Sequence, residues 1–223
     1  MKVILNLAGI LRKRVKMVQA IYGKKVGSTQ IYDENGNVLC VTAIEAKPCK
    51  IVQIKNVESD GYNALKVGFG VVKESRLNKP KKGEFAKAKV EPAKYLKEIR
   101  LADFNDEYKI GDSIDVKVFN IGDIVKITGI SKGRGFAGVI KRFHFHRGPV
   151  THGSHSIRKT GSIGMCSTPK KVMKGKKMPG RMGGERVTIP GTKIIDVLSE
   201  QNLILVKGFV PGAKGSVVYI RKA

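Results

Sequence analysis

The sequence predicts a mainly β protein with an inserted helical subdomain and one long basic loop. Short runs rich in β-branched residues, separated by turn residues, fill the first and last parts of the chain, as in a barrel or a sandwich. A Lys/Glu-rich stretch interrupts these runs between residues 73 and 110. A second interruption, residues 131–186, has no clear apolar period, and so long a segment inside a β domain indicates a functional loop.

Residues 1–16 are expected to form a basic N-terminal extension outside the core, with Met17 as an alternative first residue. Their apolar run, residues 3–11, is far shorter than the ~20 apolar residues that a membrane helix needs. The basic triplet at residues 12–14 stands where a secretory signal would need small residues for cleavage. We therefore expect neither a membrane span nor export.

Residues 17–72 are expected to supply the first strands of the barrel. The turn at residues 33–36 is the clearest hairpin signal, because Asn-Gly tolerates the positive φ that tight turns require. Runs of strand length around it predict strands at residues 18–22, 28–32, 38–45, 50–55 and 64–69.

Residues 73–110 are expected to fold as an inserted helical or α+β subdomain. Pro92 stands where a first helical turn accepts proline, so a helix is predicted over residues 93–99. Barrel strands resume in residues 111–130, with one run at 113–119, where Ile114, Val116 and Val118 alternate with polar residues, and another at 124–130.

Residues 187–223 are expected to complete the barrel. Runs rich in β-formers predict strands at residues 193–198, 203–207 and 216–221. Pro211-Gly212 marks a turn between the last two of these strands. The chain thus returns to the β domain after the basic segment.

The charge balance indicates a polyanionic partner. Among 223 residues, 43 Lys and Arg face 18 Asp and Glu, which gives a formal charge of +25 at pH 7. Such a surface favours nucleic acid or an anionic membrane, and no apolar run supports a membrane span. Three cysteines, Cys40, Cys49 and Cys166, are odd in number and form no C-x-x-C pair, which indicates a reducing compartment such as the cytosol or an organelle matrix.

Residues 131–186 concentrate the features that point to RNA. They hold 14 Lys and Arg against the single acid Glu185, 11 of the 26 glycines, and all four histidines. Cations neutralise phosphates, glycines let the backbone approach them closely, and imidazoles stack on bases or bond 2′-hydroxyls. We predict RNA contacts for Lys132, Arg134, Lys141, Arg142, His144, His146, Arg147, His152, His155, Arg158, Lys159, Lys170, Lys171, Lys174, Lys176, Lys177, Arg181 and Arg186. We predict close approach of the backbone to RNA at Gly133, Gly135, Gly138, Gly153, Gly161 and Gly164.

The segment also contains a dinucleotide-binding string, Gly133-Arg-Gly-Phe-Ala-Gly138, which matches G-x-G-x-x-G. The match is weak because no Asp or Glu occurs in residues 124–184, so the acid that would bind the ribose is absent. No alternation of strands and helices surrounds the string. We therefore expect no nucleotide cofactor and no small-molecule substrate.

Zinc binding and catalysis are two further alternatives for the same segment. The four histidines and Cys166 could ligate zinc, but their spacing matches no zinc module and cations fill the gaps between them. General acid–base catalysis needs carboxylates or an oriented histidine, and the segment offers no acid before Glu185. We expect no metal site, no cofactor and no enzymatic activity.

Several strings, in order along the chain, carry a resemblance to one protein family. They include Ser131-Lys-Gly-Arg-Gly-Phe-Ala-Gly-Val-Ile-Lys-Arg142, Thr151-His-Gly-Ser154, Gly161-Ser-Ile-Gly164, Gly175-Lys-Lys-Met178 and Asn202-Leu-Ile-Leu-Val-Lys-Gly208. With these strings, the chain from Met17 to Arg221 resembles the bacterial branch of the ribosomal protein L3 family.

The resemblance implies a six-stranded closed Greek-key barrel of the translation-protein type, an inserted α+β subdomain, and a long extension that penetrates rRNA toward the peptidyl transferase centre. It also implies a structural part in a 50S-type large subunit, cytoplasmic or organellar, with direct binding to 23S-type rRNA near its 3′ end. Early assembly of the subunit and contacts with ribosomal proteins L14 and L19 are implied as well. Thr160 and Met165 depart from the family pattern, which has Pro and a frequently methylated Gln there, so we expect no glutamine methylation at position 165.

On charge alone, a different reading of the sequence stays open: a generic nucleic-acid-binding protein or RNA chaperone. Such a protein would bind duplex DNA and rRNA fragments equally well. A structural part of the ribosome would prefer the RNA.

Overall fold

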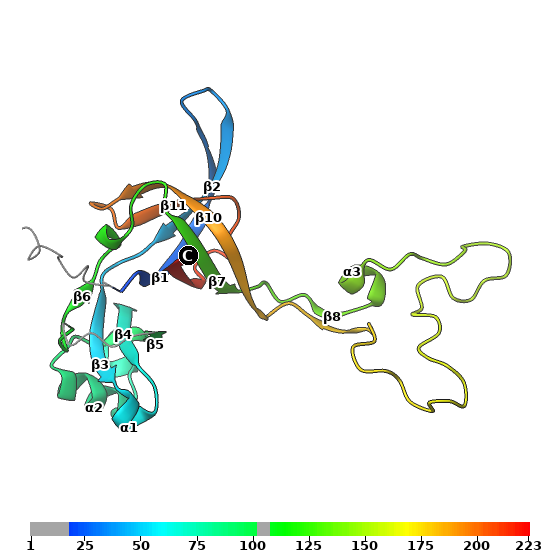
Figure 1. The fold of residues 1–223 in the computed structure, drawn as a ribbon, viewed down its shortest axis with the longest axis horizontal. Coiled ribbons are helices and arrows are strands. Elements are labelled where there is room, and N and C mark those ends of the chain that lie inside the picture. The colour runs from blue at the N-terminus through cyan, green and yellow to red at the C-terminus, as the bar shows by residue number, and fades with distance from the viewer. Residues whose placement is uncertain (1–17, 102–107) are drawn as a thin grey trace, which may run out of the picture.

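The computed structural model describes residues 18–101 and 108–223, so the expected N-terminal extension lies outside the described residues. The described strands form a closed barrel, a four-stranded sheet and a two-stranded ribbon (Figure 1). In chain order the elements are β1 (Ala20–Tyr32), β2 (Val38–Glu45), β3 (Cys49–Lys55), α1 (Val57–Asp60), β4 (Ala64–Val71), η1 (Glu74–Arg76), α2 (Lys79–Ala88), β5 (Ala93–Arg100), β6 (Ser113–Ile114), η2 (Val116–Val118), β7 (Ile124–Ile130), β8 (Gly135–Ala137), α3 (Val139–Phe143), β9 (Gly180–Met182), β10 (Arg186–Leu198), β11 (Leu203–Lys207) and β12 (Val217–Lys222).

Six strands close into an antiparallel barrel in the order β1-β12-β7-β10-β11-β2. Strands β7, β10 and β11 follow one another around the barrel, and β12 returns to lie beside β7, which is a Greek-key arrangement. Because β1 pairs with both β12 and β2, the barrel has no free edge. The expected six-stranded closed barrel is confirmed.

Strands β1 and β2 form a long hairpin that projects beyond the barrel wall (Figure 1). The sequence predicted two strands in place of β1, but the structure has one, because a bulge between Lys25 and Gly27 lets the pairing continue. The turn at residues 33–36 is confirmed. Gly36 has φ of 75°, and its amide donates to the Asp33 carbonyl at 2.8 Å.

The barrel core is aliphatic, and every barrel strand contributes one isoleucine to it. Each of these side chains is 0% exposed, and burying each stabilises the fold by about 1.5–3 kcal/mol. They alternate along their strands with outward-facing residues, as the period of a strand requires. The six are Ile21, Ile44, Ile127, Ile194, Ile204 and Ile220.

A second antiparallel sheet, ordered β5-β4-β3-β6, lies beside the barrel (Figure 1). The prediction that residues 17–72 belong wholly to the barrel is corrected, because β3 and β4 belong to this second sheet. The predicted barrel strand at residues 113–119 is also corrected: only Ser113 and Ile114 are strand, paired with β3, and η2 follows them. Strand composition does not distinguish one sheet from the other, since both are buried on one face.

The predicted helix at residues 93–99 is wrong, because these residues form β5, paired with β4. The helix of this region is α2 instead, with a proline in its first turn. Phe85 is the buried residue of α2 and packs against Val52 and Ala93. Burial of Ala93 and Ile99 within the sheet outweighs the weak helix preference of residues 93–99.

The barrel and the second sheet share one hydrophobic core. Ile51 and Leu65 of the second sheet belong to the same buried cluster as Ile21 and Ile220 of the barrel. The two sheets are therefore packed together, whereas the segment containing β8, α3 and β9 projects away from both (Figure 1). Within residues 18–101 and 108–223, no helix is long and apolar enough to cross a membrane.

Candidate nucleic-acid interface

The arm, residues 131–186, leaves the barrel as a two-stranded stem (Figure 1). Strands β7 and β10 pair as far as Ile130 and Arg186, and the Ser131 amide then donates to the Glu185 carbonyl at 2.9 Å. Farther out, β8 pairs with β9. The stem is thus a continuation of two adjacent barrel strands, and the barrel sets its direction.

Arg142 joins the two limbs of the arm at the far end of the stem. Its guanidinium donates to the Met178 carbonyl at 3.0 Å and lies 4.9 Å from the centroid of the Phe143 ring. The Lys177 Nζ lies 5.8 Å from the centroid of the same ring. A Cβ at Gly180 would lie 2.6 Å from an Arg142 guanidinium nitrogen, so glycine makes room for this contact. Arg142, predicted as an RNA contact, therefore also holds the arm together.

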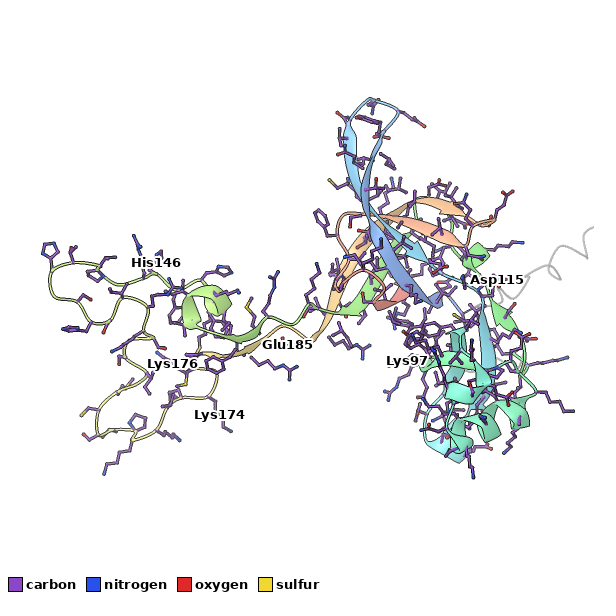
Figure 2. The ribbon with its side chains drawn as sticks, turned by 180° about the vertical axis from the view of Figure 1, so that it is seen from behind. Lys97, Asp115, His146, Lys174, Lys176 and Glu185 are labelled. Carbon is purple, nitrogen blue, oxygen red and sulfur yellow. The ribbon has the colours of Figure 1, made fainter. Side chains whose placement is uncertain are left out.

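The distal loop, residues 144–179, carries the histidines and most of the predicted lysines. Its own limbs meet where the Gly148 amide donates to the Ile157 carbonyl at 2.9 Å. Figure 2 shows His146, Lys174 and Lys176 on this loop, with Glu185 on the stem. Among the residues that the structure describes, no group of three or more His, Cys, Asp or Glu could hold a metal ion.

Nearly all arm cations are exposed, and within residues 18–101 and 108–223 they lack carboxylate partners. Every predicted cation except Arg142 is exposed, as are the four histidines. Over the described part of the chain, no arm Lys or Arg forms an ion pair, whereas the body has pairs such as Lys66–Glu84 and Lys222–Asp123, both at 2.8 Å. Unpaired like charges at this density repel one another until a polyanion neutralises them.

A half-buried lysine adds to the positive potential where the arm meets the barrel. The Lys25 Nζ donates to the carbonyls of Val210 and Gly212 at 2.7 and 3.2 Å. Desolvation lowers the pKa of Lys25, and the positive charge of Lys132, the first cation of the arm, lowers it further. An anion bound at the base of the arm would relieve this repulsion.

The six glycines predicted to admit RNA divide into two groups by backbone conformation. Three have positive φ, between 69° and 75°, so the backbone itself requires glycine: Gly135, Gly153 and Gly161. The other three have no such requirement: Gly133, Gly138 and Gly164. A Cβ at Gly133 or Gly138 would meet no atom within 4 Å, so packing within the arm does not explain glycine there. Gly183, which was not predicted, is the tightest, because its Cβ would lie 2.0 Å from the Lys132 carbonyl oxygen.

The outer barrel wall beside the arm carries a second basic surface, which we call the barrel patch. Cross-strand pairing places its members on neighbouring strands, with Arg221 opposite Lys126 and Tyr219 opposite both Tyr22 and Thr128. No member is acidic. The patch consists of Tyr22, Lys24, Lys126, Thr128, Arg186, Thr188, Tyr219 and Arg221.

Of the barrel patch, the sequence predicted only Arg186 as an RNA contact. A signal for the others was present, because Lys126 and Arg221 alternate with the buried Ile127 and Ile220. Alternation shows that a residue faces outward, but the pairing of β7 with β12 is needed to place these two cations together.

A closed barrel with an exposed cationic arm has the build of a protein that forms a structural part of a ribonucleoprotein. The family model described as "Ribosomal protein L3" matches residues 67–202. The chain belongs to the ribosomal protein L3 family, as the sequence resemblance implied, and it is a structural component of the large ribosomal subunit rather than an enzyme.

Curated relatives match most of the chain. "Large ribosomal subunit protein uL3" of Carboxydothermus hydrogenoformans is 51% identical over 207 residues, which are 93% of this chain and 98% of that protein. The proteins of the same name from Brachyspira pilosicoli and Desulfitobacterium hafniense are 48% and 50% identical over 203 residues, 91% of this chain and 93% and 95% of those proteins. These relatives are bacterial.

Proposed function

We propose that the chain binds 23S-type rRNA directly, near the 3′ end of that RNA, and acts early in assembly of the large subunit. The observation that carries this proposal is the set of exposed arm cations, which have no carboxylate partner among the described residues. Each phosphate that they neutralise releases counterions, which favours binding. The 18 Lys, Arg and His residues predicted from the sequence are the proposed contacts.

The proposed mechanism divides the work between the two parts of the protein. The packed barrel docks on the RNA surface, and the arm enters crevices where several phosphate strands converge, toward the peptidyl transferase centre. The stem supports this division because it continues β7 and β10 outward from the barrel. Gly133 and Gly138 would let phosphates reach the backbone amides of the stem.

The proposed setting is a 50S-type subunit of a cytoplasmic ribosome, with ribosomal proteins L14 and L19 as neighbours. Both neighbours follow from the family resemblance. Chemical cross-linking of assembled subunits, followed by mass spectrometry of the linked peptides, would test them.

Binding to a 3′-terminal large-subunit rRNA fragment across a salt series tests the proposal, with duplex DNA as competitor. We expect RNA-selective binding with a steep salt dependence. The matched control replaces residues 131–185 with an Asn-Gly turn, which suits the paired ends of β7 and β10. This control should bind more weakly and with a shallower slope, and equal binding by the two proteins would overturn the role of the arm.

The generic nucleic-acid-binding alternative predicts a different result in the same experiment. Its binding would come from charge alone, so duplex DNA would compete as well as unlabelled rRNA. Equal competition by the two nucleic acids would therefore favour that alternative.

A further inference from the structure

A ladder of aromatic rings crosses the junction between the barrel and the second sheet. Tyr22 of β1 stacks on Phe69 of β4 with ring centroids 5.3 Å apart and planes 4° apart. Phe69 stacks in turn on Tyr95 of β5, again at 5.3 Å. Tyr219 of β12 lies against the other side of the ladder, 4.8 Å from the Tyr22 ring. The ladder thus connects the barrel patch to the second sheet.

Hydrogen bonding and burial hold the first ring in position. The Tyr22 hydroxyl donates to the Glu98 carbonyl at 2.9 Å. Burial, together with the neighbouring Tyr219, raises the pKa of Tyr22 to about 12, so the phenol stays neutral and a donor at physiological pH. A neutral, anchored Tyr22 ring fixes the position of the rings stacked beyond it, Phe69 and Tyr95.

The ladder lines a cleft with a volume of about 180 Å³. Tyr22, Phe69 and Tyr95 form its aromatic wall, and Gly70 and Val71 at the end of β4 form another part of the lining. Gly70 has φ of 79° and carries no side chain that could cover the wall. Val71 lines the cleft but is 89% exposed, so it does not fill the cleft.

Cations surround the cleft. Lys24 and Lys47 line it, and the exposed Lys94 places its Nζ 5.3 Å from the Tyr95 ring centroid. Glu45 also lines the cleft, but its carboxylate is paired with Lys47 at 2.9 Å. Lys24 belongs to the barrel patch, so positive charge continues from the cleft across the barrel wall.

We propose that this cleft binds one unpaired nucleotide of the bound RNA, with its base stacked on Tyr95, the end ring of the ladder, and its phosphates against Lys24 and Lys94. Aromatic rings beside cations are the arrangement by which proteins hold unpaired bases. The small cleft suits a single flat base and excludes a helical segment of RNA. This inference rests on the proposed rRNA binding and adds a contact outside the arm.

A matched pair of valine substitutions tests the site without disturbing the core. Val71→Glu places a carboxylate at the cleft, whereas Val57→Glu places one on α1, where Val57 is also exposed. Losing one stacked base weakens binding by about 5-fold or more. We expect Val71→Glu to weaken binding of the full chain to the rRNA fragment by that factor, and Val57→Glu to change it less than 2-fold, about 0.4 kcal/mol.

A second measurement detects the stacking itself. With the rRNA fragment carrying 4-thiouridine, photo-cross-linking should join RNA to the peptides that contain residues 67–73 or 94–97. The chain has no Trp, so tyrosine emission is visible, and RNA should quench it less in Tyr95→Leu than in the wild type. Tyr95→Leu should leave the salt slope unchanged, because it removes no charge.

The outcomes separate this inference from the proposed function. If the wild type fails to bind the rRNA fragment selectively, the proposed function fails and the inference fails with it. If the wild type binds, but Val71→Glu and Val57→Glu bind equally and no cross-link forms at the cleft, only the nucleotide site is overturned. Circular dichroism of each variant establishes that the fold is retained.

Discussion

Ile130 and Arg186 face one another across β7 and β10, although nearly the whole arm lies between them in the sequence. The arm therefore leaves and rejoins the barrel at neighbouring positions of one sheet. Loop-closure free energy grows only slowly with loop length, so a hairpin connection tolerates a long insertion at small cost. We therefore expect the barrel to fold without the arm.

Replacing residues 131–185 with Asn-Gly should leave a folded barrel. The buried isoleucines of all six strands are untouched, and a two-residue turn suits an antiparallel pair. We expect cooperative thermal unfolding, with a midpoint at or above that of the wild type because the closed loop is shorter. Differential scanning calorimetry measures this midpoint, and a broad, non-cooperative transition would contradict the separation of barrel and arm.

The double substitution Lys176→Ala and Lys177→Ala should flatten the salt dependence of rRNA binding. Each lost phosphate contact lowers the log–log slope by ~0.7 to 0.9, so the pair should lower it by about 1.4 to 1.8. The control is Lys50→Ala with Lys66→Ala, because these lysines already pair with Glu91 and Glu84 at 3.0 and 2.8 Å. An unchanged slope in the first variant would show that Lys176 and Lys177 contact no phosphate.

Alanine at Gly133 or Gly138 should weaken rRNA binding and leave folding intact. Neither glycine has positive φ or a neighbour that a Cβ would meet, so the free energy of unfolding should change by less than about 0.5 kcal/mol. Gly183→Ala is the opposite case. Because Gly183 has φ of 72° and its Cβ would meet the Lys132 carbonyl, this substitution should destabilise the stem by at least about 1–2 kcal/mol.

Two measurements distinguish these glycine variants. Urea unfolding gives the change in folding free energy, and titration with the rRNA fragment gives the change in affinity. If Gly133→Ala and Gly138→Ala both bind like the wild type, close approach of RNA at these positions is excluded.

Arg142→Lys should loosen the junction between stem and distal loop while it keeps the charge. Lysine lacks the planar guanidinium that bonds the Met178 carbonyl and lies on the Phe143 ring. Losing the hydrogen bond should cost about 1 kcal/mol locally, which raises the exchange rate of the nearby stem amides by about 5-fold. The Arg134 amide, which donates to the Met182 carbonyl, is one of these stem amides, and hydrogen–deuterium exchange measures its exchange rate. Exchange at the wild-type rate would mean that Arg142 holds nothing together.

Cys49 should resist alkylation in the folded protein, while Cys40 and Cys166 react. Cys49 is 0% exposed, and burial raises the pKa of its thiol to about 11. At pH 8 the reactive thiolate is then only about a thousandth of the thiol, and it increases as pH rises toward that value. Mass spectrometry after iodoacetamide treatment should find two labelled cysteines in the native protein and three in urea. Labelling of Cys49 without denaturant would contradict the burial.

The barrel strands were predictable where apolar and β-branched residues form a single short run. The predicted strands at residues 38–45 and 203–207 coincide with β2 and β11. Composition could not assign β3 and β4 to a second sheet, because both sheets draw on one shared core. Residues 93–99 form a strand because they pair with β4, and their own sequence does not show this pairing.

The functional residues also divide into those that the sequence predicts and those that only the structure brings together. Composition alone locates the arm cations, since one segment concentrates them. The contact between Arg142 and Met178 joins residues 36 positions apart, and the barrel patch depends on the register of β1, β7 and β12. Periodicity predicts which way a side chain faces, but it carries no information about partners on distant strands.

Mechanically, the stem behaves as a cantilever fixed in the barrel wall. Residues 131–137 in extended conformation span about 23 Å at ~3.3 Å per residue, so tilting the barrel by about 5° would displace the end of the stem by about 2 Å. A small error in the orientation of the barrel thus becomes a larger displacement of the distal loop. Accurate seating of the barrel is the condition for accurate aim of the distal loop.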